Sequence, residues 1–368
     1  MKDPVLHIHL DSGVPEGSTD YTTVILLHGF AWHGGVFAKM IPPAHAHNAR
    51  LVLVNRRDYP GSKPYTPAEL ALLKRATALV STDAAGARTL LASFMRDRAR
   101  EVYDFLVHFI ADNDVPAADA ARNAGGIVLA GWSFSSAWMT ALLAHVGEFP
   151  MNDVEVDRYV RRVVLYDGPY HSMGYPPPSD PYNPLWDASL GSDATRAFAM
   201  WVSGYFQHGD SADAIERRTP LANPAPTLST LTDEERESAL YPGPGEPSGS
   251  DGLLLAGGIQ SGLYEQLKNA ALYLPEEIAS PLGEDGDEMV TSAWSDVEVR
   301  YIWCERSVWE MTWTSWKMRE EMREAQAQGK NMRNLKILRL LDANHFVHWD
   351  EPERCLKAFL APETASSE

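Results

Sequence analysis

The sequence is poor in cysteine and in basic residues. Its 368 residues include two cysteines, Cys304 and Cys355, which form no CxxC metal or redox motif and are too few for a disulfide framework. Lysine and arginine number 32 against 50 aspartate and glutamate residues, so the formal net charge is −18. A chain this acidic lacks the clustered cations that bind nucleic-acid phosphates, and anionic membrane surfaces should repel it.

Long apolar runs are scarce as well. The first seven residues contain no apolar run of signal-peptide length, and no stretch approaches the roughly 20 apolar residues that cross a bilayer. We therefore expect a soluble, cytoplasmic protein without membrane insertion. Apolar residues make up 45% and charged residues 22% of the chain, which is typical of globular proteins and excludes disorder of the whole chain.

Short apolar runs that end at turn residues predict the strands of a parallel sheet. Thr22–Leu27 is apolar or β-branched on both faces, which is typical of a strand covered by helices on both sides. Apolar residues recur at helical spacing over about 67–113. The other predicted strands are 5–10, 50–55, 126–130, Val160–Tyr166, 297–303 and 335–341. This alternation predicts an α/β fold with a mostly parallel sheet flanked by helices.

Residues 170–295 interrupt the alternation. The stretch is rich in proline, glycine and aromatic residues and contains no convincing buried strand. An unstructured loop of this length is unusual in a compact domain, so we expect a mainly helical lid or cap over the carboxyl ends of the strands. The core would then be 1–169 and 296–368. Residues 230–299 carry 15 acidic and two basic side chains, which disfavours strongly anionic substrates.

The clearest motif is Gly131-Trp132-Ser133-Phe134-Ser135, between a predicted buried strand and a helix. It resembles the nucleophile elbow of the α/β-hydrolase superfamily, G-x-S-x-G, with Ser135 in place of the second glycine. In such an elbow a sharp turn holds the serine in a strained backbone conformation, and small neighbours let strand and helix pass closely. The resemblance, which is to esterase- and lipase-like members with a lid, implies that Ser133 is the nucleophile.

A second segment resembles the oxyanion loop of the same superfamily. His28-Gly29-Phe30-Ala31 follows the strand Thr22–Leu27, as that loop follows its strand in the family. The resemblance implies that two backbone N–H groups stabilise a developing oxyanion. They would be the N–H of Phe30 or Ala31 and the N–H of Phe134.

A third segment, 342–353, resembles the loop that carries the family's histidine, with Asn344 in place of the usual glycine. The resemblance implies that His345 is the catalytic base. His345 and His348 could suggest a metal pair, but no third ligand is placed, so no metal or other cofactor is expected. The matches together cover about 5–168 and 297–360, and the insertion resembles no family that we can name.

The acid of the implied triad is open among three carboxylates. The family most often carries it after the strand corresponding to 297–303, but the position falls near Ser307, which is neutral. Some members carry it after the strand that follows the nucleophile helix, which here ends at Asp167. We favour Asp167 and keep Glu305 and Glu310 as alternatives.

The resemblance implies hydrolysis of a carboxylic ester or lactone through an acyl-enzyme on Ser133. The aromatic insertion indicates a small to medium apolar or aromatic substrate. We expect Trp32, Trp132 and Tyr170 to contact it.

Two alternatives stay open at this point. The same machinery can cleave thioesters, C–C bonds or cyanohydrins, because fold does not determine reaction. A non-catalytic ligand-binding protein on the same fold is the alternative from another class, and the departures at Ser135, Ser307 and Asn344 motivate it.

Overall fold

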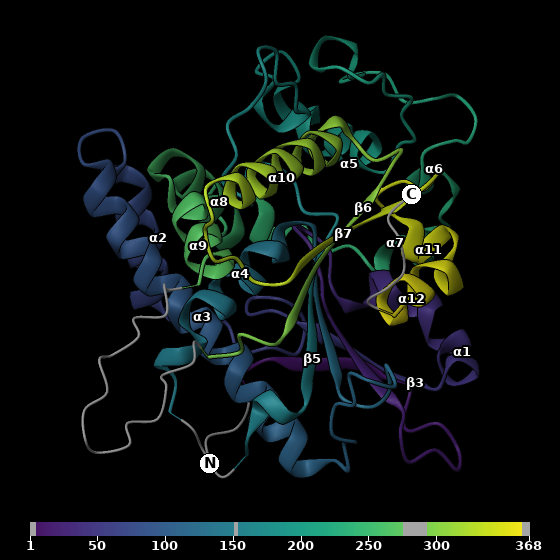
Figure 1. Cartoon of the computed structure of the whole chain (residues 1–368). Helices are drawn as coiled ribbons and strands as arrows, with labels where there is room; N and C mark the ends of the chain where they lie inside the picture. Colours follow the sequence, from purple (N-terminus) through teal and green to yellow (C-terminus); the bar gives the residue numbers. More distant parts are fainter. Residues whose placement is uncertain (1–4, 151–153, 275–292, 363–368) are drawn as a thin grey trace, which may run out of the picture.

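The computed structural model describes residues 5–150, 154–274 and 293–362. Its strands form one seven-stranded sheet with helices on both faces (Figure 1). They are β1 (His7–Asp11), β2 (Thr22–Leu27), β3 (Ala49–Asn55), β4 (Ile127–Trp132), β5 (Val160–Tyr166), β6 (Glu298–Cys304) and β7 (Leu335–Leu340). Their order is β1-β3-β2-β4-β5-β6-β7, with β1 antiparallel to β3 and all other neighbours parallel. The predicted α/β class and mostly parallel sheet are confirmed.

The central strands are buried along their whole length. Every residue of β2 to β6 is buried, whereas the edge strand β1 is exposed or half-buried throughout. This is the pattern of parallel strands covered by helices on both faces, and it explains why these segments are mostly apolar instead of alternating between apolar and polar residues. The parallel order also brings the carboxyl ends of β2 to β7 to one edge of the sheet, where ligand sites form in such folds.

The helices flank the sheet in sequence order. The predicted helical region is two helices, α2 (Pro67–Leu79) and α3 (Ala84–Asp112). Thr66 and Glu69 form a capping box that begins α2. The other helices of the core are α1 (Ile41–Ala44), α4 (Ser136–His145), α10 (Trp309–Ala327), α11 (Val347–Asp350) and α12 (Pro352–Leu360). None of the helices in the described ranges has the length and apolar character that a bilayer span requires.

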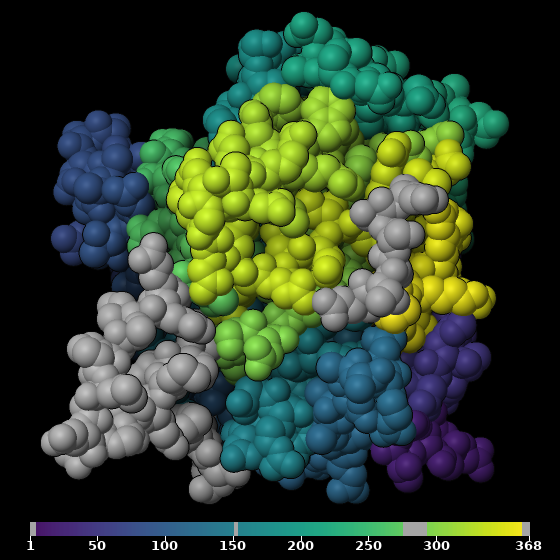
Figure 2. All heavy atoms as spheres, in the orientation of Figure 1, coloured from purple at the N-terminus to yellow at the C-terminus, as the bar shows by residue number. Residues whose placement is uncertain are grey.

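Between β5 and β6 the described residues form helices and irregular segments without a strand. The helices are α5 (Ala194–Val202), α6 (Thr227–Thr230), α7 (Asp233–Glu237), α8 (Ser250–Ser261) and α9 (Leu263–Leu272). The last two, α8 and α9, pack beside α2, α3 and α4 (Figure 1). In Figure 2 the teal residues of the insertion cover the top of the molecule, next to the yellow-green residues of α10. The division into core and cap stays a prediction, and parts of both units lie outside the described residues.

One buried histidine of the core is held neutral by its surroundings. His348 of α11 is fully buried, and its Nδ1 lies 3.0 Å from the hydroxyl of Tyr166. The rings of Trp132 and Phe37 pack against it, with ring centroids 4.6 and 4.8 Å away. Burial lowers the pKa of His348 well below 6.5, because the imidazolium would lose its hydration, and neighbouring His345 lowers it further.

Stability should therefore fall as the solution is acidified below pH 6.5. The unfolded chain takes up a proton on His348 near pH 6.5 while the folded chain does not, so each lower pH unit costs about 1.4 kcal/mol until the folded pKa is reached. Urea unfolding at pH 7 and pH 5 should show a smaller pH effect in His348→Phe than in the wild type. An equal pH effect in the two proteins would mean that His348 is charged in the folded state.

Candidate active site

Ser133 lies directly after β4, in the turn that leads into α4. Its φ is 55°, in the left-handed region that non-glycine residues seldom adopt. A side chain at Gly131 would place its Cβ 2.3 Å from the carbonyl oxygen of Ser135, so the tight passage from strand to helix requires glycine there. Ser135, which stands where the motif has its second glycine, donates a hydrogen bond to the carbonyl of His28. The departure from the motif therefore joins the elbow to the loop after β2.

His345 follows β7 and packs beside the elbow. The ring of Trp132, the residue before Ser133, lies 4.7 Å from the imidazole of His345, centroid to centroid. The indole N–H of Trp132 also donates to the carbonyl of His345 over 3.2 Å. Within the described part of the chain Ser133 Oγ makes no hydrogen bond with His345, as is common in unliganded active sites, whose hydrogen bonds tighten around substrate.

Asp167 is the carboxylate that meets His345. It follows β5 with a φ of 47°, and its Oδ2 lies 2.7 Å from His345 Nδ1. The same oxygen accepts a hydrogen bond from Ser307 Oγ over 2.5 Å, and Oδ1 accepts one from the N–H of Cys304 over 2.8 Å. Asp167 is 0% and His345 1% exposed, so these donors take the place of water. Ser307, at the position where the acid is first expected from the sequence, instead donates a hydrogen bond to the carboxylate that follows the neighbouring strand.

The two alternative carboxylates have other partners. Glu305 pairs with Arg339 and accepts a hydrogen bond from the N–H of Asp342 over 2.7 Å. Glu310 accepts a hydrogen bond from the Asn183 side chain over 3.0 Å. Among the described residues neither carboxylate hydrogen-bonds to His345.

The two backbone amides predicted as oxyanion donors have no hydrogen-bond partner among the described residues. In the described chain the N–H groups of Phe30 and Phe134 donate to no other residue, and the two rings meet edge to face with centroids 5.9 Å apart. The N–H of Ala31 instead donates to the hydroxyl of Tyr59 over 3.1 Å. Of the two amides that the sequence left open on this loop, that of Phe30 is therefore the one available.

The three predicted contact residues are all buried. Trp132 is 1% exposed and packs against His345, so its ring holds the histidine loop in place. Trp32 packs on Phe346 with ring centroids 5.0 Å apart, and Tyr170 packs on Trp309 at 5.1 Å. Their contact with substrate stays a prediction.

Sequence reasoning missed residues whose partners are distant in the chain. Asn344, which replaces the family's glycine, donates from its side chain to the Ser203 carbonyl over 2.9 Å and to the Thr227 hydroxyl over 2.8 Å. Its own Oδ1 accepts the N–H of Phe346 over 2.9 Å. Asn344 thus joins the histidine loop to the insertion, and no local pattern in the sequence indicates it.

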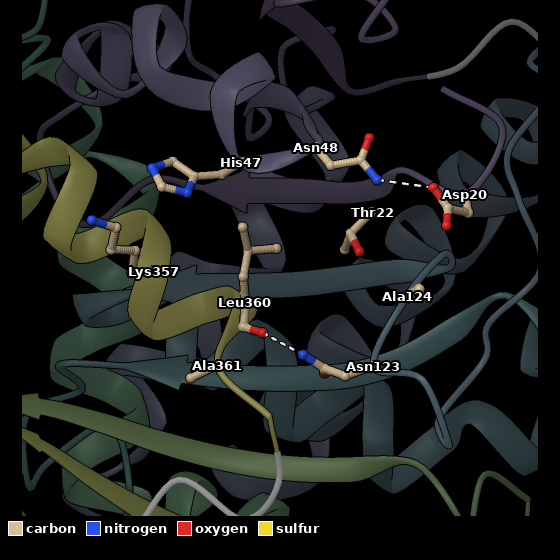
Figure 3. A pocket seen from close by; sticks show the side chains of 9 residues that line it. All are labelled: Asp20, Thr22, His47, Asn48, Asn123, Ala124, Lys357, Leu360 and Ala361. Carbon is tan, nitrogen blue, oxygen red and sulfur yellow. Dashed lines mark hydrogen bonds between the residues drawn. The ribbon is translucent and has the colours of Figure 1, made fainter. Parts of the chain in front are cut away.

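The structure also contains a cavity away from this site. It measures about 310 Å³, and its lining includes Asp20, Thr22 at the start of β2, His47, and Lys357 of α12 (Figure 3). These residues lie at the amino ends of the strands, whereas Ser133 follows a carboxyl end. In the described ranges, no three His, Cys, Asp or Glu side chains gather in a way that could hold a metal ion.

Comparison with known proteins finds similarity only among solved structures, at low sequence identity. No protein-family model and no curated protein sequence matches the chain. A lipase-esterase related protein from Clostridium acetobutylicum is 13% identical, with a TM-score of 0.42 over 96% of this chain and 99% of that one. A carboxylesterase structure from Nitrososphaera gargenis is 11% identical, with a TM-score of 0.41 over 98% and 96%. A laboratory-evolved variant of potato epoxide hydrolase is 14% identical, with a TM-score of 0.47 over 92% and 91%.

The fold is assigned from the strand order of this chain and from the places of three residues at the ends of its strands. A mostly parallel sheet of order β1-β3-β2-β4-β5-β6-β7 is followed after β4 by a serine with positive φ. An acid and a histidine follow later strands and hydrogen-bond to each other. The chain therefore has the fold of the α/β-hydrolase superfamily.

Proposed function

We propose that this protein is a serine hydrolase that cleaves a carboxylic ester or lactone through an acyl-enzyme on Ser133. The observation that carries the proposal is the buried hydrogen bond between Asp167 and His345, held against an elbow that presents Ser133 in a strained conformation. Strain of this kind persists at functional sites because the surrounding structure enforces it.

The first chemical step uses His345 as a base. Asp167 binds the proton on His345 Nδ1, which leaves the lone pair on Nε2 free to accept the proton of Ser133 Oγ. Oγ then forms a bond to the carbonyl carbon, and the carbonyl π electrons move to its oxygen. The negative charge of Asp167 stabilises the imidazolium that results.

Breakdown of the intermediate completes the cycle. The N–H groups of Phe30 and Phe134 are the donors available to the oxyanion, and each such donor is worth about 3–4 kcal/mol in the transition state. As the C–O bond breaks, the imidazolium protonates the leaving alcohol oxygen. Water then attacks the acyl-enzyme with His345 again as base, which releases the carboxylic acid and restores Ser133.

The surroundings of Ser133 support an apolar or aromatic substrate of small to medium size. Phe30 contacts both Phe134 and Phe198 of the insertion, with ring centroids 5.9 and 6.3 Å away. Trp32, Trp132 and Tyr170 are the further residues proposed to contact the substrate. A site lined by aromatic side chains gains most from removing apolar groups of the substrate from water.

The three departures from the family motifs are compatible with the proposed catalytic site. Ser135, Ser307 and Asn344 each make a hydrogen bond that holds a loop of the site. Both Ser133 and His345 are present, as the proposed mechanism requires.

Reaction with a fluorophosphonate tests the nucleophile directly. We expect one covalent adduct by intact-mass measurement on the wild type and none on Ser133→Ala. On an ester substrate, Ser133→Ala and His345→Ala should each lower kcat by roughly 10⁴–10⁶-fold, because the triad acts as a unit. Wild-type turnover in both variants would overturn the assignment.

Neutralising single carboxylates tests the acid. Asp167→Asn should lower kcat by about 10⁴-fold, since an amide cannot stabilise the imidazolium and favours the wrong tautomer. Glu305→Gln serves as the matched control and should have a mild effect, because Glu305 pairs with Arg339 rather than His345. The reverse ranking, measured as kcat on one ester, would place the acid after β6.

A further inference from the structure

A buried ion pair connects the insertion to the loop after β2. Arg56 directly follows β3 and is 1% exposed, and Asp251 lies in the first turn of α8 at 2%. The guanidinium donates two hydrogen bonds to the carboxylate, from Nη1 to Oδ1 over 2.9 Å and from Nη2 to Oδ2 over 2.6 Å. Tyr59 also donates its hydroxyl proton to Asp251 Oδ2 over 2.7 Å. Asp251 thus orders two side chains at once.

Both of these side chains hold the loop that carries the Phe30 amide. Arg56 donates from Nε to the carbonyl of His28 over 3.2 Å and from Nη2 to the carbonyl of Gly29 over 3.0 Å. The Gly29 carbonyl and the Phe30 N–H belong to one peptide plane and point in opposite directions in a trans peptide. Binding the carbonyl therefore aims the Phe30 N–H away from Arg56.

The hydroxyl of Tyr59 fixes the other side of Phe30. It accepts the N–H of Ala31, the next amide along the loop, over 3.1 Å. Burial raises the pKa of Tyr59 well above its ordinary value, and Asp251 raises it further, so the hydroxyl keeps the proton that it donates. Burial alone would lower the pKa of Arg56, but Asp251 and Tyr59 raise it above its ordinary value, so the guanidinium stays charged.

The insertion also pairs with the loop through its backbone. The N–H of Tyr241 donates to the carbonyl of Ala31 over 2.8 Å, and the N–H of His33 donates to the carbonyl of Ala239 over 2.9 Å. These two bonds make a short antiparallel bridge, Trp32 to Leu240. The loop that carries the Phe30 amide is therefore held from three directions by groups that the insertion supplies or orders.

We propose that Asp251 is a positioning residue for the oxyanion hole, acting through Arg56 and Tyr59. This role rests on the proposed function, because it presumes that the Phe30 amide stabilises an oxyanion. A buried ion pair adds little net stability compared with apolar residues of similar size, so stability by itself does not account for placing this pair under the loop. Holding a peptide plane in one orientation is a task that a bidentate Arg–Asp pair performs well.

A positioning role for Asp251 predicts different effects on kcat and on KM. Binding of the uncharged substrate depends on the aromatic walls, whereas the oxyanion exists only from the transition state onward. Loss of Asp251 should therefore lower kcat and leave KM nearly unchanged. It should also weaken a trifluoromethyl ketone, which forms a tetrahedral anion on the serine, without weakening the corresponding amide, which does not.

The experiment compares Asp251→Asn and Tyr59→Phe with the matched control Glu321→Gln. Glu321 is likewise a largely buried carboxylate that pairs with one cation, Lys268, and accepts hydrogen bonds from two tyrosines, but it lies in α10 away from the loop. Asp251→Asn should lower kcat and trifluoromethyl ketone affinity by about 10–100-fold with KM within about twofold, because a displaced oxyanion donor costs that much. Tyr59→Phe keeps the ion pair and should lower both by a smaller factor, and Glu321→Gln should change neither.

The outcomes separate this role from the proposed function. An equal loss of kcat in Glu321→Gln, or a rise in KM at unchanged kcat in Asp251→Asn, would overturn the role of Asp251. If Asp251→Asn does not fold, Tyr59→Phe decides: wild-type kcat and inhibitor affinity in that variant would overturn it. A wild type that neither turns over esters nor reacts with a fluorophosphonate at Ser133 would remove the proposed function, and this role with it.

Discussion

The arrangement of the site depends on the buried carboxylate of Asp167. A carboxylate withdrawn from water must receive hydrogen bonds from protein donors, or its burial is strongly unfavourable. The donors here come from three places in the chain: the N–H of Cys304, the hydroxyl of Ser307 and the imidazole of His345. Satisfying all three at once fixes the ends of β5 and β6 and the histidine loop relative to one another. Trp132 then fixes the histidine loop relative to the elbow.

The insertion contributes to the same framework instead of lying loosely on it. Asn344 of the histidine loop finds its partners at Ser203 and Thr227, and Arg56 under the loop after β2 finds its partner at Asp251. Moving the insertion away would exchange these hydrogen bonds for hydrogen bonds to water, a net loss of about 0.5–3 kcal/mol for each. These contacts join the insertion to the histidine loop and to the loop after β2.

Local patterns were enough to predict the sheet and the elbow. Thr22–Leu27 and Val160–Tyr166 are strands with the predicted bounds, because a strand covered on both faces is mostly apolar or β-branched and ends at polar turn residues. The single helical region predicted over 67–113 is two helices, since apolar spacing continues across the turn between them. The sequence favoured Asp167 as the acid but left Glu305 and Glu310 open, because the choice depends on which strand end faces the histidine.

The sequence by itself determined the alternating strands and helices, the sharp turn at Ser133 and the order of serine and histidine along the chain. Each of these features depends on residues that are close together in the sequence. Only the tertiary structure decided that Asp167 meets His345, that Ser307 supports that acid, and that Asp251 lies under the loop with the Phe30 amide. These contacts join residues more than a hundred positions apart, and a buried polar group is recognised as functional only when its partner is in place.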